Sequence, residues 1–126
     1  MHPFLFAAGL LGLLSVAFGA FSEHALQPRV DAEVFRYLMT AIRYNQIHAV
    51  VLLALALGLA APLAADTVRR LRLAAWLVLI GTLLFSGSIY LSVLLGIPAL
   101  TYLTPFGGTT LMLAWATLSW AGWKAR

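Results

Sequence analysis

The stretch G-I-P-A-L-T-Y-L-T-P, residues Gly96–Pro105, interrupts the longest uncharged run of the chain, Leu73–Trp123. Proline has no backbone N–H to donate within a helix, and glycine and proline close together are typical of turns. About 20 apolar residues are needed to cross the hydrocarbon core of a membrane, so the run is long enough for two crossings. The stretch therefore predicts a tight turn between two membrane-spanning helices.

Two further uncharged runs extend over Met1–Ser22 and Tyr44–Ala65. No Lys or Arg precedes the first, so we expect a retained helix and not a cleaved signal peptide. None of the runs alternates with the period of two that a barrel strand needs. We expect an all-α membrane protein, a single four-helix bundle over residues 1–126. The spans are predicted at about residues 4–21, 45–63, 73–95 and 105–123.

Composition agrees with the membrane class. Of the 126 residues 63% are hydrophobic and 10% are charged, and the mean hydropathy is +0.96. A soluble chain is about half apolar and about a quarter charged. The Lys and Arg residues stand at the ends of apolar runs, which indicates topology signals and a lipid bilayer as partner, not nucleic acid. With no cysteine, disulfides, thiolate metal sites and thiol nucleophiles are excluded.

The segment between the first two spans has its own pattern. Asp31 is a good helix N-cap, and Phe35, Leu38 and Ile42 then recur at helical spacing on one face, with charged residues opposite. This predicts a short amphipathic helix over about residues 31–43, lying in the membrane interface.

Lys and Arg counts predict the orientation. The side with both termini carries five of them, namely Arg69, Arg70, Arg72, Lys124 and Arg126. The other side carries Arg29, Arg36 and Arg43. We therefore expect a protein of the bacterial inner membrane with both termini in the cytoplasm.

The polar residues of all four spans gather in the outer half of the membrane. At about 1.5 Å per residue, Tyr90 lies about 9 Å and Ser86 about 15 Å below the outer end of the third span. Converging polar groups in a membrane suggest a pocket for a small solute or ion, and a helix start at Thr104 would favour an anion there. The candidate binding residues are His24, Tyr44, Gln46, His48, Ser86, Tyr90, Thr104, Gly107 and Gly108.

A second interpretation is that these polar groups only join helices, or assemble the protein with a partner. Small residues recur every four positions in three spans, as close helix packing requires. The candidate packing residues are Ser15, Gly19, Ala54, Gly58, Gly87, Ser88, Ser92 and Gly96. The two interpretations remain open at the level of sequence.

Metal binding and catalysis have weaker support. His24 and His48 alone are a poor ligand set, so we expect no metal and no cofactor. A triad of Ser86 or Ser88 with His48 and Glu23 lacks a nucleophile elbow, and no phosphate loop or metalloprotease motif is present, so we expect no enzyme. Transport would require a homo-oligomer or a membrane partner protein, because four short helices rarely enclose a path.

Four motifs occur in order along almost the whole chain: F-G-A-F-S-E-H-A-L (Phe18–Leu26), Y-N-Q-I-H-A (Tyr44–Ala49), F-S-G-S-I-Y (Phe85–Tyr90) and T-P-F-G-G (Thr104–Gly108). Together they resemble the bacterial domain-of-unknown-function family 423, small inner-membrane proteins with a eukaryotic relative in transmembrane protein 256. In the first motif Ser22-Glu23 replace the family's Gly-Ala, whereas His24 matches. The resemblance implies four membrane helices and no agreed activity, so it supplies no substrate.

Overall fold

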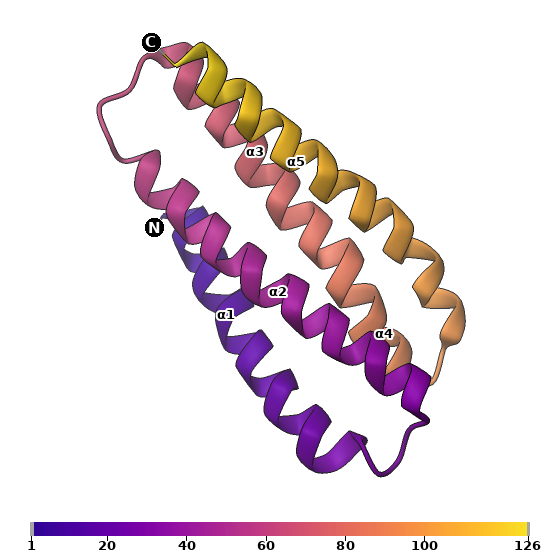
Figure 1. Cartoon of the computed structure of the whole chain (residues 1–126). Coiled ribbons are helices and arrows are strands. Elements are labelled where there is room, and N and C mark those ends of the chain that lie inside the picture. Colours follow the sequence, from indigo (N-terminus) through magenta and orange to yellow (C-terminus); the bar gives the residue numbers. More distant parts are fainter. Residues whose placement is uncertain (1, 126) are drawn as a thin grey trace.

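The computed structural model describes residues 2–125 as a bundle of helices (Figure 1). Its elements are α1 (Pro3–Phe21), the π-helical turn η1 (Ser22–Leu26), α2 (Ala32–Gly58), α3 (Ala65–Thr82), the π-helical turn η2 (Leu83–Gly87), α4 (Ser88–Leu95), the 3-10 helix η3 (Pro98–Leu103) and α5 (Thr104–Lys124). Arg126, which enters the charge count above, lies outside the described residues. The all-α class is confirmed.

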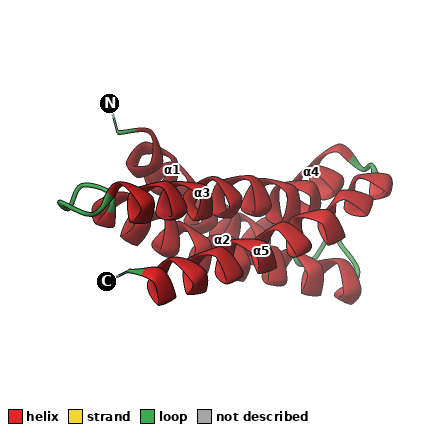
Figure 2. Ribbon diagram, turned by 90° about the horizontal axis from the view of Figure 1, so that it is seen from above, coloured by secondary structure: helices red, strands yellow, loops and turns green. Residues whose placement is uncertain are grey.

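The elements join into four long rods that run alternately up and down. The rods are α1 with η1, α2, α3 with η2 and α4, and α5. Both chain ends and the connection at residues 59–64 lie at one end of the bundle, which we call the termini end (Figure 1). The opposite end carries η1, η3 and the starts of α2 and α5, and we call it the η1 end. Figure 2 shows the loops gathered at these two ends.

Three segments are long and apolar enough to cross a membrane, judged over the described residues by length and composition. They are Pro3–Leu26, Ala32–Gly58 and Ala65–Leu95. Helix α5 is 21 residues long, but its several Thr, Gly and Trp residues make it less apolar. The count of four bundle helices therefore agrees with the prediction, and three of the four have the length and composition of a membrane span.

A separate interfacial helix at residues 31–43 is not found. The Asp31 side chain does cap the helix, accepting from the Val34 backbone N–H at 2.9 Å, so the predicted start is right. The helix then continues without a break to Gly58, because neither glycine nor proline occurs between Ala32 and that residue. The amphipathic segment is thus the first part of α2, and the second span ends about five residues earlier than expected.

The predicted turn at Gly96 is present. Gly96 caps α4 in the left-handed conformation, with φ of +65°, which glycine adopts without steric cost. The Ile97 backbone N–H donates to the Ser92 carbonyl at 3.0 Å. Pro98 then begins η3, and Pro105 occupies the first turn of α5, where a missing N–H costs nothing.

Two apolar clusters fill the bundle, with a polar layer between them. The cluster toward the termini end includes Phe4, Leu11, Leu52, Leu55, Ala74, Ala75, Val78 and Ala114. The cluster toward the η1 end consists of Leu38, Ala41, Ile42, Ile89 and Tyr90. Along the rods, the buried polar residues between them are Ser15, Asn45, His48, Thr82 and Ser86. These five residues lie near the middle of the bundle, and the other buried polar residues, Ser22, Ser88 and Ser92, lie toward the η1 end.

The outer surface of the bundle is strongly apolar. Large side chains exposed on its rods include Phe6 and Val16 on α1, Val50 and Leu57 on α2, Leu73, Ile80 and Leu94 on the third rod, and Met112 and Leu113 on α5. Monomeric soluble proteins rarely expose apolar surface on this scale. Such a surface fits hydrocarbon and not water.

Candidate functional site

Tyr90 links three rods at the η1 side of the polar layer. Its hydroxyl accepts a hydrogen bond from the Asn45 side-chain amide at 3.2 Å, and its ring stacks on Phe18 with centroids 4.0 Å apart. One turn away, the Ser86 hydroxyl donates to the Ala41 carbonyl at 2.6 Å. Tyr90 and Ser86 are both buried, so these two predicted binding residues are occupied in joining helices.

His48 is held by a partner on α5. The Trp115 indole N–H donates to His48 Nε2 at 3.2 Å, and indole nitrogen is a donor only. Nε2 therefore accepts, and Nδ1 carries the proton that it donates to the Tyr44 carbonyl at 2.7 Å. With both ring nitrogens engaged, His48 has no lone pair left for a metal or a ligand.

The start of α5 is also used for packing. A Cβ atom placed on Gly107 would stand 2.3 Å from the Phe85 backbone nitrogen, so α5 touches the backbone of η2 at this point. Beside this contact the hydroxyls of Ser88 and Thr104 lie 2.6 Å apart. Gly107 and Thr104, predicted as binding residues, therefore support the contact between the third rod and α5.

The predicted packing glycines have more space around them than Gly107 has. A Cβ atom on Gly58 or Gly87 would meet no heavy atom within 4 Å, and one on Gly19 only the Ile42 side chain at 3.9 Å. The close approach occurs at Gly107 and also at Gly81, where a Cβ would lie 2.8 Å from the Leu111 side chain. Sequence spacing therefore did not pick out the glycines that make the closest contacts within the described residues.

The other predicted packing residues lie as follows. Ser15 is buried and donates within its own helix to Gly12. Ala54 is exposed and lines a shallow apolar groove. Ser92 is buried and accepts from Ile97 through its carbonyl. Of this set, Ser88 makes a side-chain contact with the neighbouring η3–α5 junction.

The candidate binding residues do not share one cavity. His24 and Gln46 line a groove of about 490 Å³ between α1 with η1 and α2. Tyr44 and His48 line a second groove, of about 330 Å³, between α2, η2 and α5, and the two grooves have no residue in common. Thr104 lies in a third groove, of about 450 Å³, beside η3. The sequence placed these residues at similar depths along the helices, but the helix faces that carry them diverge.

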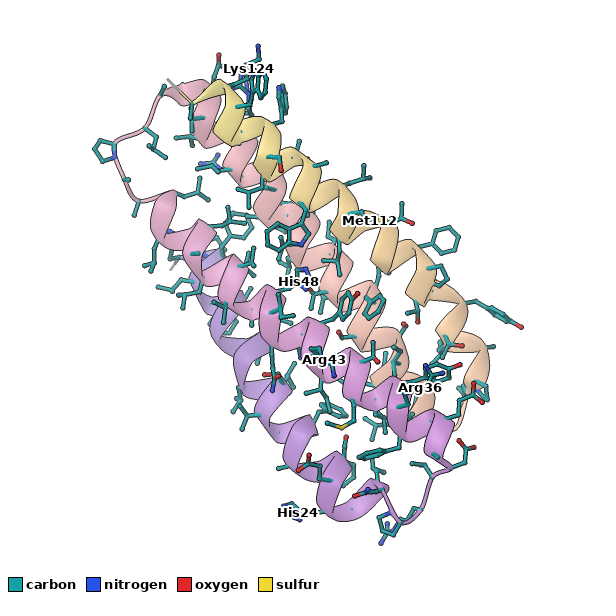
Figure 3. The ribbon with its side chains drawn as sticks, in the orientation of Figure 1. His24, Arg36, Arg43, His48, Met112 and Lys124 are labelled. Carbon is teal, nitrogen blue, oxygen red and sulfur yellow. The ribbon has the colours of Figure 1, made fainter. Side chains whose placement is uncertain are left out.

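The first of these, the α1–α2 groove, differs from the others in charge. Its full lining is Ser15, Val16, Gly19, Ala20, Glu23, His24, Met39, Ile42, Arg43 and Gln46. Glu23, His24, Arg43 and Gln46 are exposed. Within the described residues, none of these four side chains makes a hydrogen bond or an ion pair, the two recorded ion pairs being Arg36–Glu33 and Arg69–Asp66. Figure 3 shows His24 at the η1 end, with Arg43 and then His48 further along α2.

Two buried polar atoms lie close in sequence to this groove. The Ser22 hydroxyl and the Asn45 side-chain oxygen are buried without a hydrogen-bond partner among the described residues. Buried polar atoms are nearly always paired. Neither residue lines the groove, and the Asn45 amide is directed toward Tyr90 on the third rod.

A metal site has no support in the described part of the chain, which holds no group of three or more His, Asp or Glu residues suited to a metal ion. His24 and His48 line different grooves. The two-histidine ligand set considered from the sequence is therefore not assembled.

The sequence did not single out Asn45, Trp115 or Arg43. The partner of Trp115 depends on the register between α2 and α5, which no local pattern reveals. Arg43 carried a usable signal, since it is the last charge before the uncharged run that begins at Tyr44. A charge at such a boundary, beside polar residues of the same helix, suggests an interfacial site.

Comparison with known proteins agrees with this architecture. Residues 18–108 match the family described as "Protein of unknown function (DUF423)". A UPF0382 membrane protein of Haemophilus influenzae is 32% identical over 125 residues, covering 99% of this chain and 97% of its own length. The UPF0382 membrane protein YwdK of Bacillus subtilis is 31% identical, covering 91% of each chain. The UPF0382 inner membrane protein YgdD of Escherichia coli is 28% identical, covering 90% of this chain and 84% of its own. No solved structure matches.

The helical bundle, its apolar surface and these relatives define a small integral membrane protein. The chain belongs to the DUF423 family and is similar over nearly its whole length to the UPF0382 membrane proteins of the three bacteria above. The resemblance inferred from the four motifs is confirmed.

Proposed function

We propose that this is an inner-membrane binding protein that holds a small polar ligand in the α1–α2 groove, at the η1 end of the bundle. One observation carries the proposal: this groove gathers Glu23, His24, Arg43 and Gln46 from two rods, and within residues 2–125 none of these side chains has a hydrogen-bond or ion-pair partner. Polar side chains kept at the edge of a membrane without an internal partner are expected to serve binding.

The depth of Arg43 supports an interfacial position. Helix α2 has 27 residues, so at about 1.5 Å per residue it is about 40 Å long and exceeds a hydrocarbon core of about 30 Å. The part of α2 that extends beyond the hydrocarbon core is its polar N-terminal part, where Asp31, Glu33 and Arg36 lie. Arg43 then stands a short way inside the hydrocarbon boundary, from which a long Arg side chain reaches the headgroup region.

We further propose that α5 is the fourth span and that the termini end faces the cytoplasm. Arg69, Arg70, Arg72 and Lys124 lie at that end, which follows the positive-inside rule. Arg70 also lies over the Trp120 ring, 4.8 Å from its centroid, as an interfacial anchor of α5. The α1–α2 groove would then open toward the outer face of the inner membrane.

A purely structural or accessory role is the second candidate. It is favoured by the bonds that occupy Ser86, Tyr90, His48 and Thr104, all of which join rods. In this alternative the exposed apolar surface would receive a partner chain or a second copy. The α1–α2 groove would then be an ordinary surface depression with solvated charges.

Co-purification tests the two candidates. The wild-type protein and an Arg43→Gln, Gln46→Ala variant are purified in mild detergent, and retained small molecules and lipids are identified by native mass spectrometry. We expect the wild type to retain a ligand that the variant has lost. Arg36→Gln is the matched control, because Arg36 is an exposed arginine of the same helix outside the groove. Equal adducts on all three proteins would contradict binding in the groove.

A further inference from the structure

We infer that the ligand of the α1–α2 groove is a zwitterion that carries an anionic oxygen group and an ammonium group. The inference rests on the proposed function and names the chemical class of its ligand. It follows from the placement of one acid and one base in the same groove without contact between them.

Glu23 comes from η1 on one wall and Arg43 from α2 on the other. Each is exposed, and they do not form an ion pair within 4.0 Å. Elsewhere in the described residues, Arg36 does pair with Glu33, at 3.9 Å, and Arg69 with Asp66. The groove thus presents two opposite charges that face a common space and are both available.

Near the membrane boundary, where the effective dielectric constant is below that of water, each charge gains from an opposite partner. An anion alone would satisfy Arg43 but would meet the negative field of Glu23. A cation alone would have the reverse problem with Arg43. A zwitterion satisfies both, so the charge arrangement selects against either half of the molecule by itself.

The side chains of the groove also divide into donors for an anionic group and acceptors for an ammonium group. The Arg43 guanidinium offers paired N–H donors that match the geometry of a phosphate or carboxylate. Gln46 lies three residues further along α2 and therefore on a neighbouring position of the same face. Its amide can add a donor to the anionic group. Glu23 is an acceptor for the ammonium, and His24 beside it offers a further ring nitrogen.

The groove extends along both helices. Glu23 and His24 lie toward the η1 end, whereas Arg43 follows Ile42, which faces Gly19, and Gln46 lies still further into the bundle. Its volume of about 490 Å³ is within the range of small-molecule sites. The small side chains of Ser15, Gly19 and Ala20 leave room for a ligand body. The same zwitterion chemistry occurs in a phosphatidylethanolamine headgroup and in a free solute such as phosphoethanolamine.

The test compares a zwitterion with its two halves. Binding of phosphoethanolamine, inorganic phosphate and ethanolamine to the full-length protein is measured by calorimetry. Binding of phosphatidylethanolamine and of phosphatidylglycerol, which lacks the ammonium, is measured by native mass spectrometry. We expect at least one zwitterion to bind about tenfold or more tightly than its counterpart without the ammonium. Binding of the lipid alone identifies a headgroup site, and binding of the free compound alone identifies a solute site.

Two variants test the role of each charge in binding, and two further variants serve as controls. Arg43→Gln should abolish binding of every phosphate compound, whereas Glu23→Gln should keep phosphate binding and remove the preference for the zwitterion. The matched controls Arg36→Gln and Glu33→Gln change exposed charges of α2 outside the groove and should bind like the wild type. All four residues are exposed, so the variants should fold, which the melting temperature checks.

Two outcomes distinguish a failure of the zwitterion inference from a failure of the proposed function. If phosphate or phosphatidylglycerol binds in an Arg43-dependent way as tightly as the zwitterions, the zwitterion inference is wrong and the proposed groove stands. If no probe binds in a way that Arg43→Gln abolishes, and the purified wild type also carries no ligand that this variant lacks, the inference and the proposed function are both wrong.

Discussion

Gly107 lies directly against the backbone of Phe85, so close that a Cβ atom on Gly107 would come within 2.3 Å of the Phe85 nitrogen and 2.7 Å of its α-carbon. The contact joins the start of α5 to the π-helical turn η2. A backbone neighbour cannot rotate away as a flexible side chain can. This pair therefore fixes how the fourth rod sits on the third.

Gly107→Ala should destabilise the bundle. The added methyl group would have to displace the η2 backbone, and overpacking of this kind costs about 1–3 kcal/mol. The measurement is the midpoint of thermal unfolding in detergent. Gly87→Ala is the matched control, since a Cβ there meets no atom within 4 Å, and it should leave the midpoint unchanged or raise it slightly through helix propensity. Equal midpoints for the two variants would contradict the close contact.

Ser86→Ala should also lower stability, to a smaller extent. It removes the hydrogen bond to the Ala41 carbonyl, and a bond between membrane helices contributes about 0.5–1.5 kcal/mol. Unfolding in mixed micelles of increasing SDS content gives the difference in free energy. The control is Ser119→Ala, whose exposed hydroxyl bonds within its own helix and should cost less. A Ser86 variant as stable as the control would show that the interhelical bond contributes nothing.

The His48–Trp115 contact predicts one tautomer. Because the indole N–H donates to Nε2, the His48 ring should be neutral and protonated on Nδ1. Nitrogen NMR of histidine-labelled protein distinguishes the two neutral tautomers, and Trp115→Phe should disturb the His48 signals while leaving those of His24 unchanged. Observation of the Nε2-protonated form in the wild type would rule out the Trp115 hydrogen bond.

The membrane topology can be determined by labelling single introduced cysteines, since the chain has no cysteine of its own. Gln27→Cys lies in the connection at the η1 end, and Ala61→Cys in the connection at the termini end. In intact spheroplasts a membrane-impermeant maleimide should label the first variant, and should label the second only after the membrane is permeabilised. The reverse pattern would turn the orientation around and place the α1–α2 groove on the cytoplasmic side.

The sequence predicted the features that follow from local chemistry. Helix count, the Asp31 cap and the turn at Gly96 depend on a few neighbouring residues and on long uncharged runs, so they were correctly anticipated. The continuity of α2 was missed, because a change from amphipathic to apolar pattern does not by itself end a helix when no Gly or Pro intervenes.

The site was only partly accessible from the sequence. Counting residues along a helix gives depth, but the direction in which a side chain points depends on which rods are neighbours. His24 and His48 therefore seemed close, although they line separate grooves. The two π-helical turns at Ser22–Leu26 and Leu83–Gly87 shift the faces further. The second of these turns lies against Gly107 at Phe85, a contact that no short motif encodes.

The most direct test of the groove is an experimental structure of the protein in nanodiscs that contain its native lipid extract. We predict ordered non-protein density in the α1–α2 groove that contacts both the Arg43 guanidinium and the Glu23 carboxylate. A structure in which Glu23 and Arg43 pair directly with each other, with the groove closed between them, would contradict the account.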